Sequence, residues 1–301
     1  MLKMIKLPLP SETHSVSLDS CLSDLPASKL AYKFRLSRAK TDLVKQSLAY
    51  SSKATSLDLH QFKASKRARP QDKIPFCGGG VSKGDLVDLY KGVFSKKGTA
   101  SRAIYNRIKL SSDERCSICL VGEAETLDHY LPKARYPAFS VDPQNLIPAC
   151  TKCNKGKGAS LLSKKEEHVL HPYFSSSKYY EELWLKAEIV EETPVKVRFF
   201  VDPPVGWNAD EVTLLESHFK EFGLADKFAL FVAHAVVTEI DTVDISLNRR
   251  DLSVEVIQED FEIKANNRPS INSPIAAMYR AMSESRWFCS EPRKHEENGY
   301  I

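Results

Sequence analysis

The chain has 301 residues, of which 42% are hydrophobic and 27% charged, and its formal net charge is +4. This composition is ordinary for a globular protein with a sizeable core, which argues against a disordered or fibrous chain. No run approaches the roughly 18 apolar residues of a membrane helix, and "MLKMIKLPLPSETH" is a poor signal peptide, so we expect a cytoplasmic protein without membrane association.

The small net charge conceals an uneven distribution along the chain. Residues 1–109 hold 21 Lys and Arg against 8 Asp and Glu, and residues 128–165 hold 7 against 2. Residues 166–301 hold 14 against 25. Basic surface of this density is typical of proteins that bind nucleic acid, although a solvated surface has the same composition. We do not expect the acidic C-terminal part to be a major nucleic-acid surface.

The N-terminal region, residues 1–109, is predicted to be mostly helical with flexible segments. Residues 1–30 mix Pro and Ser and are expected to be extended or poorly ordered. Residues 27–54 carry apolar side chains near helical spacing, which predicts one helix or two. Two short amphipathic helices are predicted just before residue 110, with Ser82 and Thr99 as their N-caps.

A basic, glycine-containing segment lies between these helices. Residues 60–84 read "HQFKASKRARPQDKIPFCGGGVSKG" and combine a Lys/Arg cluster with two prolines and three consecutive glycines. This composition predicts a mobile connection. Its candidate phosphate contacts are Lys63, Lys66, Arg67 and Arg69, for which a solvated loop is an equal alternative. The "CGGGVSKG" part lacks the spacing of a P-loop and is interpreted as a flexible turn.

The C-terminal region, residues 166–301, is predicted to be mostly helical with one short hairpin. Two β-prone runs surround residues 192–194. A long helical stretch follows, with Asp210 or Asn208 as its cap and Gly223 dividing it into two helices. A last helix is predicted over residues 273–286, before a polar tail.

Four of the seven cysteines form two C-x-x-C pairs in residues 110–165. Cys116 and Cys119 are separated by thirty residues from Cys150 and Cys153. An odd number of cysteines in a reducing compartment favours metal binding over disulfides. Two such pairs are typical of a structural zinc site, and four thiolates leave no open position for catalysis. The alternative is two unrelated pairs.

Asp128, His129 and Asn145 lie between the two cysteine pairs, and Asn154 directly follows the second pair. The first two are neighbours in a β-prone stretch, so their side chains point to opposite faces of a strand. Each residue alone is more often structural than catalytic. Because two cysteine pairs of the zinc-binding type accompany these four residues in this order, we interpret all four as functional.

The segments "LDHYLPK" (127–133), "NL" (145–146) and "CTKCNKGK" (150–157) resemble the HNH endonuclease family. The resemblance implies a ββα-metal core that is held by the four-cysteine zinc site and flanked by helical N- and C-terminal regions, an α+β and mainly helical fold. It implies His129 as the general base, Asp128 and Asn154 as ligands of a catalytic Mg²⁺ or Mn²⁺, and Asn145 as the residue that orients His129 through a hydrogen bond. The pattern reads His-Asn-Asn, a departure that the family tolerates.

The chemical requirements of phosphodiester hydrolysis support this assignment independently of the resemblance. Phosphodiester hydrolysis needs a water deprotonated near neutral pH, which histidine can provide, and a divalent ion to neutralise phosphate charge. One carboxylate and one amide leave room for water and phosphate oxygens around Mg²⁺. Further candidate phosphate contacts are Lys133, Lys155 and Lys157, which could equally be solvated.

Flanking segments also resemble, less specifically, bacterial HNH proteins of anti-phage systems such as the Septu nuclease subunit, which work beside an ABC-type ATPase. The resemblance implies a defence endonuclease that acts on nucleic acid, DNA ahead of RNA, with an ATPase partner bound by the acidic C-terminal region. Two alternatives remain open. One is a non-catalytic zinc-ribbon module that binds nucleic acid or protein, and the other is a nuclease that is inactive without its partner.

Overall fold

The computed structural model describes residues 6–66, 73, 76–157 and 162–290. The chain divides into two compact units, described here one at a time: residues 6–118 with 122–175, and residues 176–290 with the short stretch 119–121. Both units combine helices with a two-stranded antiparallel sheet, so the fold is α+β and mainly helical, as the sequence predicts. No helix in these described ranges is long and apolar enough to cross a membrane.

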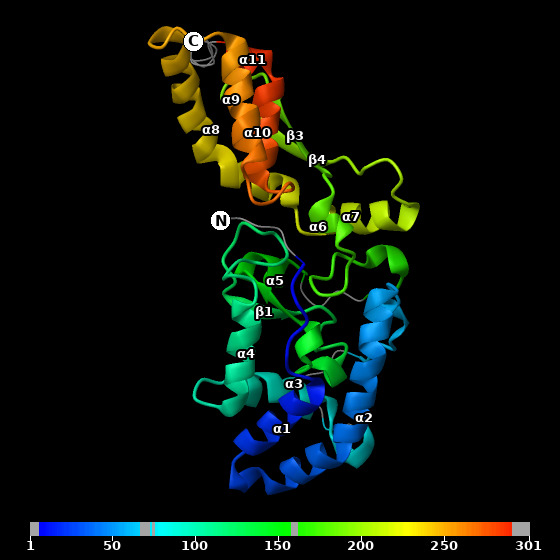
Figure 1. Ribbon diagram of the computed structural model, residues 1–301. Coiled ribbons are helices and arrows are strands. Elements are labelled where there is room, and N and C mark those ends of the chain that lie inside the picture. The colour runs from blue at the N-terminus through cyan, green and yellow to red at the C-terminus, as the bar shows by residue number, and fades with distance from the viewer. Residues whose placement is uncertain (1–5, 67–72, 74–75, 158–161, 291–301) are drawn as a thin grey trace. The chain divides into compact units, whose positions relative to one another are not determined.

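The N-terminal unit packs α-helices against a small sheet (Figure 1). Its helices are α1 (His14–Asp24), α2 (Leu30–Thr55), α3 (Lys83–Leu89), α4 (Ala100–Leu110) and α5 (Thr151–Lys157). Its strands are β1 (Thr126–His129) and β2 (Leu146–Ala149), and a π-helical turn, η4 (Tyr90–Phe94), continues α3. A core of buried apolar side chains from α1, α2, η4, α4 and both strands joins these elements, so the helices fix the position of the sheet.

Helix α1 corrects the expectation that residues 1–30 are extended or poorly ordered. The Thr13 hydroxyl caps the helix by accepting a hydrogen bond from the Val16 N–H. Leu18 and Cys21 are fully buried in the core of the unit. The stretch is rich in serine and weak in intrinsic helix propensity, so tertiary burial decides its structure.

Residues 76–84 also differ from the expected mobile connection. Gly79 has a φ of 78° inside a short 3-10 turn. A Cβ at this glycine would lie 2.6 Å from the backbone oxygen of Arg35 in α2. The glycines therefore allow close packing of the turn on α2, rather than free movement. Ser82 and Thr99 are the N-caps of α3 and α4, as predicted.

The C-terminal unit places helices beside a second hairpin (Figure 1). Its helices are α6 (Lys178–Glu181), α7 (Ala209–Glu221), α8 (Leu224–Asn248), α9 (Val254–Asn266), α10 (Pro274–Glu284) and α11 (Arg286–Cys289). Strands β3 (Leu185–Val190) and β4 (Lys196–Val201) form the predicted hairpin. Gly223, with a φ of 55°, separates α7 from α8, and Asn208 caps α7, both as predicted. Helix α9 is an element that the sequence analysis did not identify.

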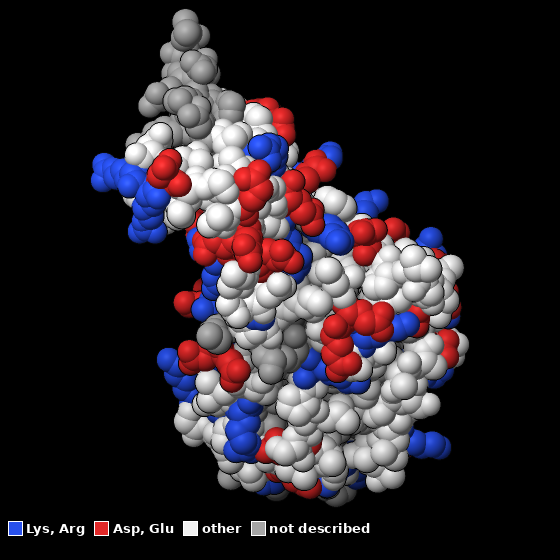
Figure 2. Space-filling model, turned by 45° about the horizontal axis from the view of Figure 1, so that its top comes forward, with Lys and Arg blue, Asp and Glu red and all other residues white. Residues whose placement is uncertain are grey.

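The visible face of the C-terminal unit carries grouped Asp and Glu side chains with Lys and Arg among them (Figure 2). Inside the unit, the Glu239 carboxylate accepts hydrogen bonds from the Tyr279 hydroxyl at 2.8 Å and the Lys264 ammonium at 3.0 Å. These contacts tie α8 to α9 and α10.

Candidate functional site

The four cysteines of the two C-x-x-C pairs come together in the structure. The sulfur atoms of Cys116, Cys119, Cys150 and Cys153 all lie within 4.8 Å of one another, and all four residues are buried. The backbone N–H of Cys153 donates to the Cys150 sulfur at 3.4 Å, an arrangement that favours the thiolate form. Four converging thiolates are the ligand set of a closed structural zinc site, which this cluster fits.

The cluster lies at the ends of a strand–strand–helix arrangement. Strands β1 and β2 pair antiparallel, with Asp128 opposite Ile147 and His129 opposite Leu146. Cys150 directly follows β2, and Cys153 lies in α5, which packs against β1. A metal at the cysteines would therefore fix one end of the sheet, and His129 lies at the opposite end.

His129 is held by a backbone carbonyl. Its Nε2 lies 2.9 Å from the carbonyl oxygen of Ser140, and the residue is 4% exposed. A carbonyl oxygen can only accept, so Nε2 carries the proton of the neutral ring and Nδ1 is the nitrogen that can take up another. The Tyr90 ring packs edge-on against the imidazole at 4.5 Å between centroids. The imidazole therefore has a defined tautomer and orientation.

Asn145 does not make the hydrogen bond to His129 that the resemblance implies. Its amide donates to the carbonyls of Leu131 at 3.0 Å and Phe139 at 3.1 Å. Its Oδ1 accepts from the Leu131 N–H at 2.7 Å and the Tyr50 hydroxyl at 3.1 Å. These four bonds use both donors and both acceptor positions of the amide. Asn145 therefore holds the loop between β1 and β2, and that loop carries the Ser140 carbonyl.

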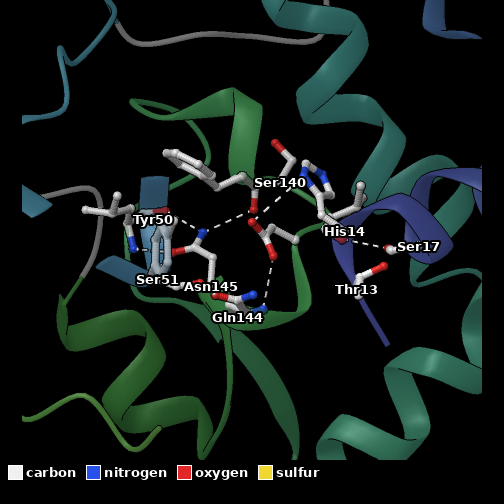
Figure 3. Close-up of polar contacts among 12 residues, drawn as sticks. Thr13, His14, Ser17, Tyr50, Ser51, Ser140, Gln144 and Asn145 are labelled. Atoms are coloured by element: carbon white, nitrogen blue, oxygen red, sulfur yellow. Dashed lines mark hydrogen bonds and ion pairs between the residues drawn. The ribbon is translucent and has the colours of Figure 1, made fainter. Parts of the chain in front are cut away.

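A buried chain of hydrogen bonds supports Asn145 from α2 (Figure 3). The Tyr173 N–H donates to Nδ1 of His171 at 3.3 Å, so the neutral imidazole carries its proton on Nε2. That Nε2 lies 3.1 Å from the Tyr50 hydroxyl, which leaves the Tyr50 proton for Asn145. Burial raises the pKa of Tyr50 well above its ordinary value, so the hydroxyl stays protonated. His171 is thus a hydrogen-bonding residue.

Helix α1 contacts the same loop from its other side (Figure 3). The Ser17 hydroxyl donates to the Val141 carbonyl at 2.6 Å. Nδ1 of His14 lies 3.8 Å from the Asp142 carboxylate, and both residues are buried. Burial lowers the pKa of His14, and the Asp142 charge opposes this shift. Two helices that lie far from this loop in the sequence, α1 and α2, therefore hold it on two sides.

Asp128 and Asn154 lie on adjoining elements. Asp128 is 5% exposed, and its Oδ1 accepts from the His129 N–H at 2.7 Å. Asn154 is half-buried in α5, and its own N–H donates to the Cys150 carbonyl at 3.0 Å. A carboxylate and an amide oxygen are the donor types that Mg²⁺ or Mn²⁺ prefers, so the chemistry of these two side chains is compatible with such an ion.

The candidate basic contacts fall into three groups. Lys133 is half-buried, and its ammonium lies 4.8 Å from the centroid of the Tyr90 ring. Lys155 is exposed on α5, which ends at Lys157. Lys63 and Lys66 are also exposed. Arg67 and Arg69 lie outside the described residues.

The segment that carries Lys63 and Lys66 is anchored rather than mobile. The Phe62 ring packs against Phe139 at 5.0 Å between centroids. Both the N–H and the hydroxyl of Ser65 donate to the Arg135 carbonyl at 2.9 Å. These contacts hold the two lysines beside the loop between β1 and β2.

Sequence reasoning missed several residues that shape the site. Ser140 acts through its backbone carbonyl, so its side chain gives no signal. Tyr50 lies in an ordinary helical pattern 95 residues before Asn145. Tyr90 lies in one of the predicted short helices, and its contact with His129 depends on tertiary packing.

Comparison with known proteins finds one relative along nearly the whole chain and one along a short part of it. Protein ea31 of Escherichia phage lambda is 29% identical to this chain over 299 residues, which cover 95% of this chain and 99% of that protein. Septu protein PtuB of Bacillus thuringiensis is 35% identical over 66 residues, which cover 20% of this chain and 25% of that protein. No family model matches the chain. No solved structure matches it either.

Proposed function

We propose that this chain is a metal-dependent endonuclease of the HNH type that hydrolyses phosphodiester bonds in nucleic acid. The observation that carries the proposal is the arrangement of His129. It lies on β1 of a strand–strand–helix unit clamped by four cysteines, and its Nε2 is bonded to a backbone carbonyl. With the proton on Nε2, Nδ1 is the basic nitrogen of the ring, and it lies in a basic part of the chain.

In this proposal each residue has one role. His129 Nδ1 accepts a proton from water, whose oxygen attacks phosphorus as the bond to the leaving oxygen breaks. Asp128 and Asn154 would hold a catalytic Mg²⁺ or Mn²⁺, which would supply charge neutralisation on the phosphate oxygens. Asn145 acts indirectly, because it holds the loop whose Ser140 carbonyl orients His129. The four cysteines hold structural zinc.

We further propose a role in anti-phage defence beside an ATPase subunit. The partial similarity to Septu protein PtuB supports this role, together with the sequence resemblance to nuclease subunits of such systems. The chain carries no P-loop motif, so ATP-dependent control would come from another protein. The acidic C-terminal unit is the surface that we assign to such a partner.

The test compares cleavage of supercoiled plasmid and of total RNA by the wild type and by His129→Ala, each with Mg²⁺ or Mn²⁺. We expect the variant to lose activity by about 100-fold or more, with zinc content and thermal unfolding unchanged. His234→Ala is the matched control, because His234 is exposed on α8 in the other unit. It should retain full activity.

Two other outcomes have defined meanings. If the wild type cleaves only when an ABC-type ATPase of an anti-phage system is added, and His129 is still required, the chain is a gated nuclease subunit. If no condition gives cleavage that depends on His129, the chain is a zinc-ribbon module that binds without chemistry, and the proposed function is wrong.

A further inference from the structure

One ammonium group lies beside the proposed catalytic residues without a carboxylate partner. Lys133 is half-buried, and no Asp or Glu in the described parts of the chain lies within ion-pair distance of its Nζ. Burial, followed by repulsion from Lys91, lowers its pKa, while the Asp128 charge opposes both. A partly desolvated cation of this kind is stabilised when an anion binds next to it.

The Tyr90 ring contacts both this ammonium and the imidazole of His129. The Lys133 Nζ lies 4.8 Å from the ring centroid, and the His129 ring lies 4.5 Å from the same centroid. The Tyr90 hydroxyl donates to the Leu127 carbonyl in β1 at 3.3 Å, which fixes the ring against the strand that carries Asp128 and His129. A cation over an aromatic face is attracted by the electron density of the ring.

The backbone that presents Tyr90 is itself unusual. Tyr90 begins the π-helical turn η4, which continues α3. Turns of this kind are rare and often occur at functional sites. Lys91 is the next residue of the turn and is exposed. Thus η4 supplies the ring that contacts His129 and Lys133, and a further cation whose charge acts on Lys133.

We propose that Lys133 binds the phosphate undergoing cleavage and stabilises the charge that develops on it, with Tyr90 as the positioning residue for both Lys133 and His129. This inference rests on the proposed nuclease function and deepens it. It separates Lys133 from the exposed lysines, which would contact neighbouring phosphates of the backbone. Lys133 is then a catalytic residue, because its effect appears in the transition state more than in substrate binding.

The first test measures kcat and KM for cleavage by the full-length protein. Lys133→Met keeps the length and packing of the side chain but removes its charge. We expect kcat to fall on the order of 100-fold with little change in KM, since one preorganised charge contact to a transition state is lost. Lys155→Met removes an exposed lysine of α5 and should raise KM while kcat stays the same. Lys133→Arg should restore part of kcat.

The second test examines Tyr90 through a matched pair of variants. Tyr90→Phe keeps the ring and removes only the bond to the Leu127 carbonyl, so most of kcat should remain. Tyr90→Leu removes the ring, and kcat should fall toward that of Lys133→Met. In the double variant Lys133→Met/Tyr90→Leu, the fold-loss in kcat should be smaller than the product of the two single fold-losses, because both substitutions act through the same ammonium.

The outcomes separate this inference from the function on which it rests. If cleavage depends on His129 while Lys133→Met retains the wild-type kcat, the inference is overturned and the nuclease assignment stands. A change in KM alone for Lys133→Met would also overturn it, by reducing Lys133 to an ordinary backbone contact. If no cleavage depends on His129, both proposals fail together. Zinc content and thermal midpoint, measured for every variant, show whether a loss reflects misfolding.

Discussion

At the scale of single residues, the orientation of His129 depends on groups that never touch the reacting atoms. The Ser140 carbonyl fixes the imidazole, and Asn145 fixes the loop that carries this carbonyl. The Asn145 amide has no unused donor or acceptor, so any change in its chemistry leaves backbone groups of the loop without partners.

Asn145→Asp is expected to destabilise the protein and to remove activity. The substitution keeps the shape but replaces the two N–H donors with an oxygen, which then faces the carbonyls of Leu131 and Phe139. We expect a loss of about 2–4 kcal/mol in the free energy of unfolding, because two buried carbonyls lose their donor and meet a charge. Urea denaturation and plasmid cleavage measure the two effects.

The matched control for this variant is Gln144→Glu. Gln144 is only half-buried, and its Oε1 acts as an acceptor for the Ser51 hydroxyl, a bond that a carboxylate can also make. This variant should remain close to wild type in stability and activity. Equal losses in both variants would show that any negative charge in the loop is harmful and that the amide bonds of Asn145 are not the cause.

Tyr50→Phe tests the support that α2 gives to Asn145. The variant loses the hydroxyl between His171 and Asn145, which leaves Asn145 with three of its four bonds. We expect a destabilisation of about 1–3 kcal/mol with cleavage largely retained. Tyr32→Phe is the control on the same helix, because its hydroxyl donates to the Asp85 carbonyl in a part-buried position. A thermal midpoint for Tyr50→Phe that matches Tyr32→Phe would mean that the buried chain contributes no more than a part-buried bond.

The residues that sequence reasoning identified are those whose side chains carry the chemistry. Asp128, His129 and the cysteines stand in a recognisable order within about forty residues, so their roles can be proposed without a structure. Ser140 and Tyr50 could not be found in this way. The first acts through its backbone, and the second meets Asn145 only because α2 folds back onto the loop.

At the scale of elements, the four cysteines connect three short segments. Strands β1 and β2 have four residues each, and α5 has seven. Elements this short are marginal without a constraint. The cluster joins the turn before β1 to the start of α5 and provides that constraint once metal is bound.

Cys116→Ser is therefore expected to release zinc and to lower the thermal midpoint by more than 5 °C, since structural zinc contributes several kcal/mol to folding. Mass spectrometry measures the zinc content, and circular dichroism measures the thermal midpoint. Cys77→Ser, at a half-buried cysteine outside the cluster, is the control and should retain zinc. A wild-type protein without zinc, whose unfolding does not respond to a strong chelator, would contradict the expected role.

Two histidines connect the segment before Lys63 to the segment after α5. Nδ1 of His60 lies 3.3 Å from Nε2 of His168. Burial, followed by the charge of His60, lowers the pKa of His168 to about 4. The folded state therefore favours neutral His168, whereas the unfolded chain binds a proton near pH 6.5. This contribution to stability is complete above about pH 6.5 and is lost as the pH falls toward 4.

The difference in thermal midpoint between wild type and His168→Gln measures this effect. It should be largest near pH 7 and should shrink as the pH falls to 4, because the variant cannot be protonated there. Shared losses, such as zinc release in acid, cancel in the difference. His234→Gln, at an exposed histidine of the C-terminal unit, is the control variant. A constant difference for His168→Gln would show that the pair is not linked to folding.

The elements were predictable where local signals agree with packing. The caps Ser82, Thr99 and Asn208 and the break at Gly223 are local signals, and all four are confirmed. Helix α9 also has a local signal that was overlooked, namely the Ser253 cap followed by buried Ile257, Phe261 and Ala265 at helical spacing. Helix α1 also has a cap, Thr13, and buried residues at helical spacing, but two of them, His14 and Ser17, are polar, so the sequence shows no continuous apolar stripe.

At the scale of the whole molecule, charge is divided between the two parts of the chain. The basic residues precede and include the proposed site, while residues 166–301 hold 25 acidic against 14 basic side chains. The acidic groups are visible on the face of the C-terminal unit in Figure 2. Binding of a polyanion should therefore depend on the N-terminal unit alone.

The salt dependence of binding tests this division. In the His129→Ala background, which prevents cleavage, the logarithm of the binding constant for a DNA duplex should fall linearly with the logarithm of the salt concentration. Removing Lys63 and Lys66 together should make this slope shallower by about 2, since each lysine neutralises one phosphate. The anchoring of their segment by Phe62 and Ser65 makes them fixed contacts beside the loop.

Arg249 and Arg250 provide the matched pair, because both are exposed and lie in the acidic unit. Replacing them with alanine removes the same charge but should leave the slope unchanged, since no phosphate reaches them. If both double variants change the slope equally, binding follows only the net charge of the molecule. An unchanged slope for the Lys63 and Lys66 variant, with binding intact, would move the contact surface to other basic residues and leave the anchored segment with a structural role.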